Sequence, residues 1–256
     1  MKRNLLLSLL VVVALFFTGC FETTEEITVN ADGTGSYNMN MDMSGLFQFF
    51  DAMSSMDTSA ASSKKKKEKM DTTITMRTFT DTAANLTVAQ KALLHDATMK
   101  MVMDEEAQQF KMNMAFPFKQ LSDVEKIIAL SHSTSGTNIM GKMVLPGEVA
   151  ESNNAPAMPD LGSYFDMTLQ PHLIERKLNK EKYKSLNGDM QQNGMGESAE
   201  MLGSVKMNTV IHLPVAAKKA TGTGLILSAD KKTVTISGTM EDLTKNPEKF
   251  SYRIEY

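Results

Sequence analysis

The sequence has no tryptophan, one cysteine (Cys20) and four histidines in 256 residues. A lone cysteine excludes an intramolecular disulfide. The histidines are scattered, and none stands at metal-ligand spacing from another histidine or from the cysteine: His95, His132, His172 and His212. The chain also lacks the nucleophile elbow, the phosphate-binding glycine loop and the zinc-protease helix motif. We therefore expect no enzymatic activity, no cofactor and no metal site.

An excess of either charge is absent as well. The chain carries 27 basic and 30 acidic residues, with a formal net charge of −3, whereas a protein that binds nucleic acid needs a basic face. We expect no nucleic-acid partner. With 42% hydrophobic and 22% charged residues, the composition is that of a folded globular protein. The length favours one domain built around one sheet.

The first twenty residues have the three parts of a bacterial export signal. Lys2 and Arg3 supply a positive start, and an apolar run interrupted by Ser8 extends over 5–17. As a helix this run is roughly 20 Å long, too short for the ~30 Å hydrocarbon layer of a membrane. It therefore predicts a signal peptide over residues 1–19.

The segment Phe17-Thr18-Gly19-Cys20 resembles the lipobox of bacterial lipoproteins, which signal peptidase II cleaves, although Phe17 stands where leucine is usual. The resemblance implies a diacylglyceryl group on Cys20 and usually a third acyl chain such as palmitate. Two or three chains anchor a protein stably, at about 0.8 kcal/mol per buried CH₂. The alternative is a free thiol behind an ordinary signal peptide. We expect a lipid-anchored protein of the cell envelope.

Residues 20–24 are predicted to be a lipidated tether in which acidic side chains are solvated; a second interpretation of Glu22, Glu25 and Glu26 is a surface-export tag. Phe21 replaces the aspartate that retains many proteobacterial lipoproteins in the inner membrane. An outer-membrane location is therefore favoured where the cell has such a membrane.

Residues 25–256 are predicted to form a single α+β domain with a largely antiparallel β-sheet and several helices packed on one face. Alternating apolar residues predict strands at 25–29, 37–43, 73–79, 99–103, 110–118, 164–170, 173–178, 205–213, 223–228, 232–237 and 250–256. Helical spacing predicts helices at 46–53, 86–95 and 122–130, and one helical turn at 240–246. Long irregular segments predict mobile loops near 54–70, 132–162 and 187–200.

Methionine is abundant, with 22 residues. Alternation along the clearest predicted hairpin places five of them on one face: Met99, Met101, Met103, Met112 and Met114. These residues, which we name the methionine ladder, have three interpretations. They fill the core, line a pocket for an apolar ligand, or bind Cu(I) through soft thioethers, with His95 nearby in the sequence. Core packing is favoured, because the pattern is that of a half-buried sheet.

Two further motifs each have a functional interpretation and a purely structural one. The basic run Lys64–Lys67 with Lys69 would bind anionic headgroups or simply remain a solvated loop, and the loop is favoured. The segment Asp32-Gly33-Thr34-Gly35 indicates a hairpin turn. It lacks the additional acidic ligands that a calcium loop needs.

The order of these features resembles uncharacterised lipoproteins of the Bacteroidota envelope: an acidic tether, the turn at 32–35, an aromatic helix, and a β-rich end with the segments 211–214 and 233–236. The chain is more distantly similar to the mycobacterial LppM-type lipoprotein domain, a β-rich fold associated with envelope lipids. These resemblances imply a non-enzymatic binding protein for an apolar ligand or an envelope protein. Alternatives are a structural or assembly lipoprotein, Met-based Cu(I) binding, and an enzyme with an unrecognised site.

Overall fold

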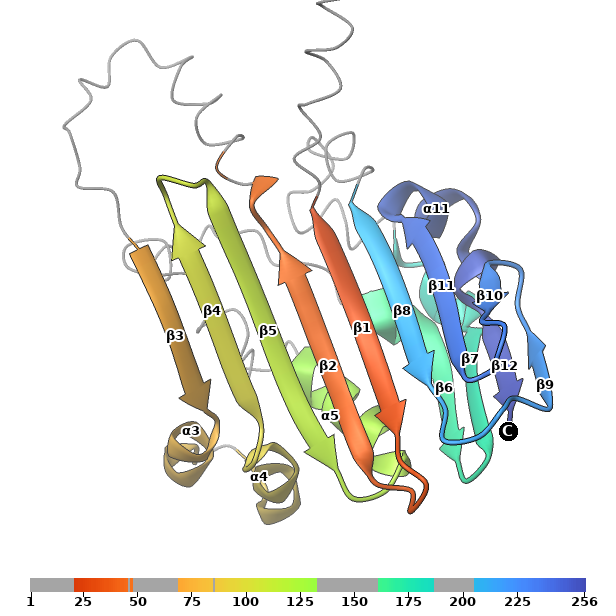
Figure 1. Cartoon of the computed structure of the whole chain (residues 1–256), viewed down its shortest axis with the longest axis horizontal. Helices are drawn as coiled ribbons and strands as arrows, with labels where there is room; N and C mark the ends of the chain where they lie inside the picture. Colours follow the sequence, from red (N-terminus) through yellow and green to blue (C-terminus); the bar gives the residue numbers. More distant parts are fainter. Residues whose placement is uncertain (1–20, 46, 48–68, 85, 133–160, 187–204) are drawn as a thin grey trace, which may run out of the picture.

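The computed structural model describes residues 21–45, 47, 69–84, 86–132, 161–186 and 205–256. These residues form two β-sheets and several short helices (Figure 1). The predicted α+β fold with a largely antiparallel sheet is confirmed, but the expectation of a single sheet is wrong. The predicted helix at 46–53 and most of the predicted loops near 54–70, 132–162 and 187–200 lie outside the described residues.

Sheet A has eight strands in the order β10-β11-β8-β1-β2-β5-β4-β3 (Figure 1). Its strands are β1 Glu22–Val29, β2 Gly35–Asp42, β3 Lys69–Thr75, β4 Thr98–Asp104, β5 Gln109–Phe118, β8 Lys206–His212, β10 Leu225–Leu227 and β11 Thr233–Thr239. Neighbouring strands are antiparallel except β1 and β8, which pair in parallel. This parallel pair joins the amino-terminal and carboxy-terminal parts of the chain into one sheet.

Sheet B has four antiparallel strands in the order β6-β7-β12-β9. They are β6 Phe165–Gln170, β7 Leu173–Leu178, β9 Lys219–Thr221 and β12 Tyr252–Glu255. The predicted strands on either side of Pro171 are confirmed as the β6–β7 hairpin. His172 in its turn has φ 65°, in the left-handed region that few residues other than glycine adopt. The short strand β9 was not predicted.

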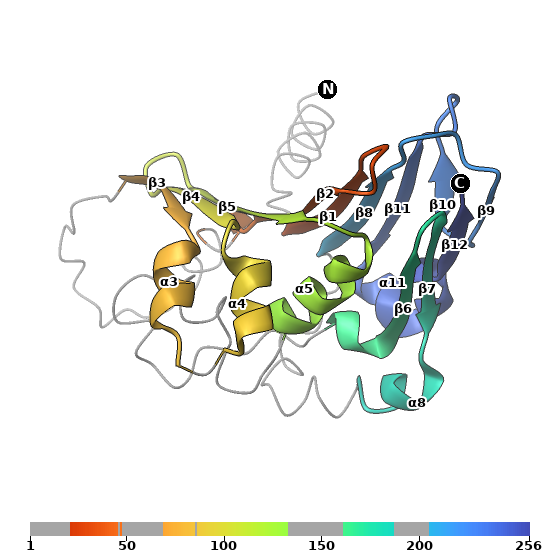
Figure 2. The same cartoon turned by 90° about the horizontal axis from the view of Figure 1, so that it is seen from below.

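The helices lie on one face of sheet A, and sheet B lies beside α5 on the same side (Figure 2). The α-helices are α3 Arg77–Thr82, α4 Val88–Leu94, α5 Ser122–His132, α8 Lys180–Tyr183 and α11 Met240–Lys245, with 3₁₀ turns η1 Leu161–Tyr164 and η2 Pro247–Phe250. Thr87 and Gln90 form a capping box that begins α4. The predicted helices at 86–95 and 122–130 are confirmed.

The predicted strand at 73–79 is wrong beyond Thr75, because the chain turns into α3. The amide of Met76 donates to the carbonyl of Ala97 at 2.8 Å, and the amide of Thr80 donates back to the carbonyl of Met76 at 2.8 Å. Met76 is buried. The bond to Ala97 continues the β3–β4 pairing, in which Thr75 is opposite Thr98. Met76 then adopts helical dihedral angles (φ −69°, ψ −10°) and begins α3, against the local alternation.

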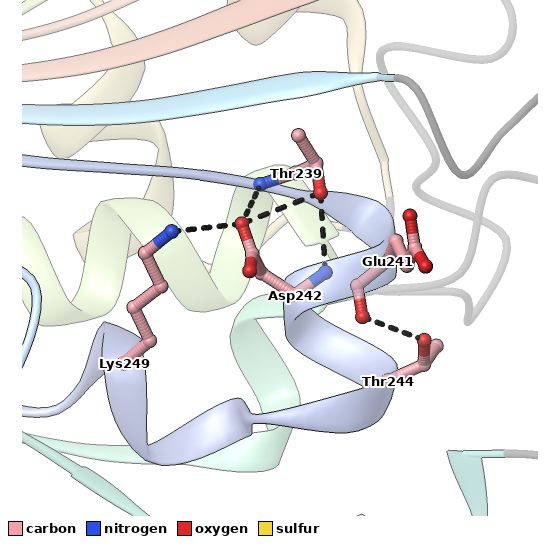
Figure 3. A network of polar contacts seen from close by, with 5 residues as sticks. All are labelled: Thr239, Glu241, Asp242, Thr244 and Lys249. Atoms are coloured by element: carbon pink, nitrogen blue, oxygen red, sulfur yellow. Dashed lines mark hydrogen bonds and ion pairs between the residues drawn. The ribbon is translucent and has the colours of Figure 1, made fainter.

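A polar network ties α11 to the turn η2 (Figure 3). Thr239 and Asp242 form the capping box of α11, and the Lys249 ammonium donates to the Asp242 carboxylate at 2.8 Å. The Lys249 hydrogen bond lowers the pKa of the Asp242 carboxyl. In the same helix, the Thr244 hydroxyl donates to the Glu241 carbonyl at 2.9 Å. The predicted helical turn at 240–246 is confirmed as α11.

The core lies between sheet A, the helices and sheet B. Alternate residues of β5 point into it, and each is at most 6% exposed: Phe110, Met112, Met114, Phe116 and Phe118. Burial of one such side chain contributes about 1.5–3 kcal/mol. Gly35 is required opposite this row, because a Cβ there would lie 1.9 Å from the Thr28 carbonyl oxygen and 2.4 Å from the Phe118 ring.

A buried ion pair links the two sheets. The Arg176 guanidinium on β7 lies 3.4 Å from the Glu25 carboxylate on β1 and 4.2 Å from the centroid of the Phe165 ring. Only 8% of the Arg176 side chain is exposed. Burial raises the pKa of the adjacent Tyr252 phenol to about 12. The expectation that Glu25 is a solvated tether group is wrong, since its carboxylate pairs with sheet B.

We expect Arg176→Met to lower the free energy of unfolding by about 2–4 kcal/mol, because it leaves the partly buried Glu25 carboxylate without its cation. Urea denaturation measures the change. Arg253→Met is the matched control, since Arg253 pairs with Glu175 and Glu255 at 42% side-chain exposure. The control should cost less than about 1 kcal/mol. Equal losses in the two variants would contradict a special role for the buried pair.

Candidate functional site

The face of sheet A opposite the helices is polar, and no other described element covers it. The register places five hydrogen-bonding side chains in one row across β8, β1, β2, β5 and β4: Asn208, Thr24, Asn40, Asn113 and Lys100. None of the five is buried. The Asn113 amide donates to the Asn40 carbonyl oxygen, and the Asn208 amide donates to the Glu22 carboxylate at 2.8 Å. We name this set the amide row.

A charged row lies beside it, nearer to the start of β1. Glu22, Asp42 and Lys111 are neighbours in the register across β1, β2 and β5. The Lys111 ammonium lies 3.5 Å from the Asp42 carboxylate. Partial burial raises the pKa of the Asp42 carboxyl, but hydrogen bonds from Ser44 and the charge of Lys111 outweigh burial, so the pKa is lowered overall. This row carries both signs of charge, with two neighbouring carboxylates and one ammonium group.

Residues of both rows line a shallow hollow of about 390 Å³ over β1, β2, β5 and β4. Its lining combines amide, hydroxyl, carboxylate and ammonium groups with apolar atoms, to which Met41, Val102 and Met112 contribute. Such a surface offers hydrogen bonds and ion pairs to a polar partner. Among the described residues, no group of three or more His, Cys, Asp or Glu side chains is placed to hold a metal ion.

The methionine ladder lies on the opposite, inner face of the sheet. Each of its five residues is at most 9% exposed. Met101 is opposite Met112 and Met99 is opposite Met114 in the β4–β5 register, and the helices cover this side (Figure 2). The ladder and the hollow are therefore on different faces. The sequence-based interpretations as an apolar-ligand face or a Cu(I) face stay predictions.

The histidines lie on separate elements with separate partners. His95 follows α4, and its Nδ1 lies 2.8 Å from the Asp96 carboxylate. The His172 ring packs edge-on against Tyr256, with 5.6 Å between ring centroids. On β8, His212 Nε2 lies 3.0 Å from the Glu26 carboxylate. His132 ends α5. The described imidazoles, those of His95, His172 and His212, thus each have a local structural partner.

The lysine run and the β1–β2 turn are the two motifs for which the sequence left alternative interpretations. Lys64–Lys67 lie outside the described residues, whereas Lys69 begins β3, so the predicted loop ends before it. The Asp104 carboxylate 3.1 Å away raises the pKa of the Lys69 ammonium. In the β1–β2 turn, the Asp32 carboxylate accepts from the Thr34 hydroxyl at 2.7 Å and from its amide at 3.0 Å. These bonds stabilise the turn.

The described structure begins at Phe21, directly after Cys20. The Lys206 amide donates to the Phe21 carbonyl at 2.8 Å, and β1 begins at Glu22. The prediction of a tether over 20–24 is therefore wrong for its last three residues, which belong to sheet A. Within the described part of the chain, no helix is both long and apolar enough to cross a membrane.

Sequence reasoning missed the Glu25–Arg176 pair, although a signal for it exists. Glu25 shares the alternation of Ile27 and Val29, and Arg176 shares that of Ile174 and Leu178. A charged residue in an inward-facing position requires a partner. The alternation therefore predicts that both side chains point inward, but it does not predict that they contact each other.

The chain matches no protein-family model and no curated protein sequence. Among solved structures it is similar to the folded domain of the LppM protein of Mycobacterium tuberculosis, determined by NMR. The TM-score is 0.36 and the identity 8%, over 94% of this chain and 93% of that chain. The weak likeness to an LppM-type domain expected from the sequence is thus present, at a level that transfers neither residues nor activity.

We expect acid to remove the stabilisation of the fold that the Asp42 carboxylate, beside the hollow, contributes. Because the pKa of Asp42 is lowered below 3.8 in the folded protein, the unfolded chain takes up the proton first as the pH falls. The stabilisation by Asp42 is therefore complete above the unfolded pKa and is lost as the pH falls through the folded pKa.

We expect Asp42→Asn to lower the free energy of unfolding at pH 7, with the difference from the unmodified protein shrinking toward about pH 3. Urea denaturation at both pH values measures it. Asp71→Asn, an exposed carboxylate on the same face, is the control and should change stability little. A loss for Asp42→Asn that does not vary with pH would contradict the assignment.

Proposed function

We infer that this protein is a non-enzymatic, lipid-anchored binding protein of the bacterial cell envelope, whose partner is another envelope protein. The observation that carries the proposal is the start of the ordered domain. Sheet A begins at Glu22, two residues after Cys20, and Phe21 is already hydrogen-bonded to Lys206. A lipid on Cys20 therefore connects to a central strand without a flexible spacer.

This connection orients the domain. β1 runs away from Cys20 for 8 residues, which is roughly 25 Å at about 3.3 Å per residue. The strand ends that carry Glu22, Asp42 and Lys111 are then nearest to the membrane, and the β1–β2 turn is farthest from it. Both the open face of sheet A and its edges face sideways into the envelope compartment, where a protein partner can reach them.

Burial favours a protein partner over an apolar ligand. The thioethers that would hold an acyl chain are packed in the core, with Met99 at 2% and Met112 at 2% exposure. The outer face instead presents amides and charges of both signs, which suit the polar contacts of a non-obligate protein interface. The apolar-ligand alternative is an outcome of the mass-spectrometry test below.

We expect the full-length protein to incorporate radioactive palmitate in bacterial cells, and Cys20→Ala to abolish the label, because the thiolate receives the glyceride. Thr18→Ala is the control: it keeps a small residue before the cleavage site and should retain the label. Mass spectrometry of the mature chain gives the lipid mass. A label that persists in Cys20→Ala, or is absent from the unmodified protein, would overturn lipid anchoring.

The second prediction concerns the ligand. Residues 21–256, exported without the lipid, should show the unliganded mass in native mass spectrometry, because the methionine ladder is packed. An added fatty-acid or phospholipid mass, lost in Met101→Trp or Met112→Trp, would contradict a purely protein-binding role. It would instead support an apolar-ligand pocket at the β4–β5 hairpin.

A further inference from the structure

We propose that strand β3, at the edge of sheet A, is the docking strand for an extended segment of the partner, which adds to the sheet as a further strand. The inference rests on the proposed function, since it assumes a protein partner. It specifies the contact, which is main-chain hydrogen bonding at a sheet edge.

Among the described residues, no strand pairs with the outer edge of β3. It is the last strand of sheet A in the described structure and pairs with β4 alone. In an antiparallel pair, alternate residues point their N–H and C=O groups away from the neighbouring strand. Most of the strand is exposed: Lys69, Asp71, Thr73, Ile74 and Thr75. The opposite edge, β10, spans only 3 residues and offers a much shorter ladder.

In the described structure, β3 has no proline, no bulge and no charge that points inward. Proteins block edges with proline, bulges, short strands or charges that point inward. β3 pairs with β4 over 7 residues in unbroken register, and its sequence contains no proline. Its charged side chains are on the outer face and are already neutralised by β4 or its turn, Lys69 by Asp104 at 3.1 Å and Asp71 by Lys100 at 3.6 Å.

The inner side of β3 defines the chemistry of the added strand. Ile74 is 37% exposed, whereas Met99, its partner on β4, is 2% exposed. Met70 lies opposite Met103 and is partly buried. An added strand with apolar residues beside Met70 and Ile74, and polar residues between them, would complete burial of the sheet's apolar border. The partner segment is therefore amphipathic with a period of two.

A second copy of this chain fits the edge poorly. Pairing β3 antiparallel with β3 of another copy requires a two-fold axis perpendicular to the sheet. That operation inverts the second copy, so its β1 would start, and its Cys20 would lie, at the far end of the sheet. Two lipid-anchored copies whose strands run away from one membrane cannot pair in this way. A segment of a different protein has no such restriction.

Hydrogen–deuterium exchange on the full lipidated chain in detergent micelles tests the proposal. The probe is the synthetic peptide Lys-Met-Asp-Thr-Thr-Ile-Thr, which has the required alternation. We expect saturable binding and about tenfold slower exchange of the amides at 69–75, with β12 unchanged. The same peptide methylated on alternate backbone nitrogens should not bind, because it lacks the donors. Protection by the methylated peptide, or no protection by the first, would overturn strand addition.

A matched pair of variants localises the contact. Ile74→Lys places a charge on the inner side of the edge and should weaken peptide binding at least about tenfold. Val88→Lys introduces the same residue on α4, where Val88 is 86% exposed, and should leave binding unchanged. Equal effects of the two variants would contradict docking at β3. The methylated peptide keeps the test decisive even where Ile74→Lys fails to fold.

Sedimentation of the full chain identifies the occupant. A monomer in micelles supports a different protein as the partner, whereas a dimer abolished by Ile74→Lys would overturn that choice in favour of a second copy. The two proposals fail separately. The absence of a palmitate label, or the presence of an acyl ligand in the native mass, would contradict the proposed function even if β3 is protected. An unprotected β3 contradicts only strand addition.

Discussion

The pairing of β1 with its neighbours is the constraint on which the rest of this structure depends. β1 pairs antiparallel with β2 and parallel with β8, so it joins strands from both ends of the chain. Its Glu25 carboxylate reaches Arg176 of sheet B, and its first residue follows Cys20 almost directly. One strand thus connects the two sheets and the expected anchor, and a shift in its register would disturb all of them.

The division of sheet A into two unlike faces follows from the alternation of side chains along its strands. On β5, methionine and phenylalanine point inward while Lys111 and Asn113 point outward. The inner face is covered by helices and by sheet B (Figure 2). On the outer face, Lys111 is exposed and Asn113 is partly exposed. Function by binding is consistent with this division, because the chemistry available to a partner is hydrogen bonding at the face and along the edge.

Local patterns were reliable where short-range contacts decide the structure. The β1–β2 hairpin follows from its alternation and from Asp32, whose carboxylate accepts from Thr34 within the turn. The β4–β5 hairpin and the helix begun by Thr87 are likewise encoded within a few residues. The same patterns failed at residues 77–82, where Met76 adopts helical dihedral angles and the chain continues as α3 instead of a strand.

The sequence by itself determined which residues face the core, where the hairpins turn, and that Cys20 stands in a lipobox-like segment, because each depends on neighbouring residues. Only the tertiary structure decided that β1 pairs with β8, that Arg176 meets Glu25, and that β3 lies at an edge. Alternation gives the face of a strand but not its neighbour. The neighbour is selected by packing of the whole chain, so the candidate face and edge emerge only in the folded protein.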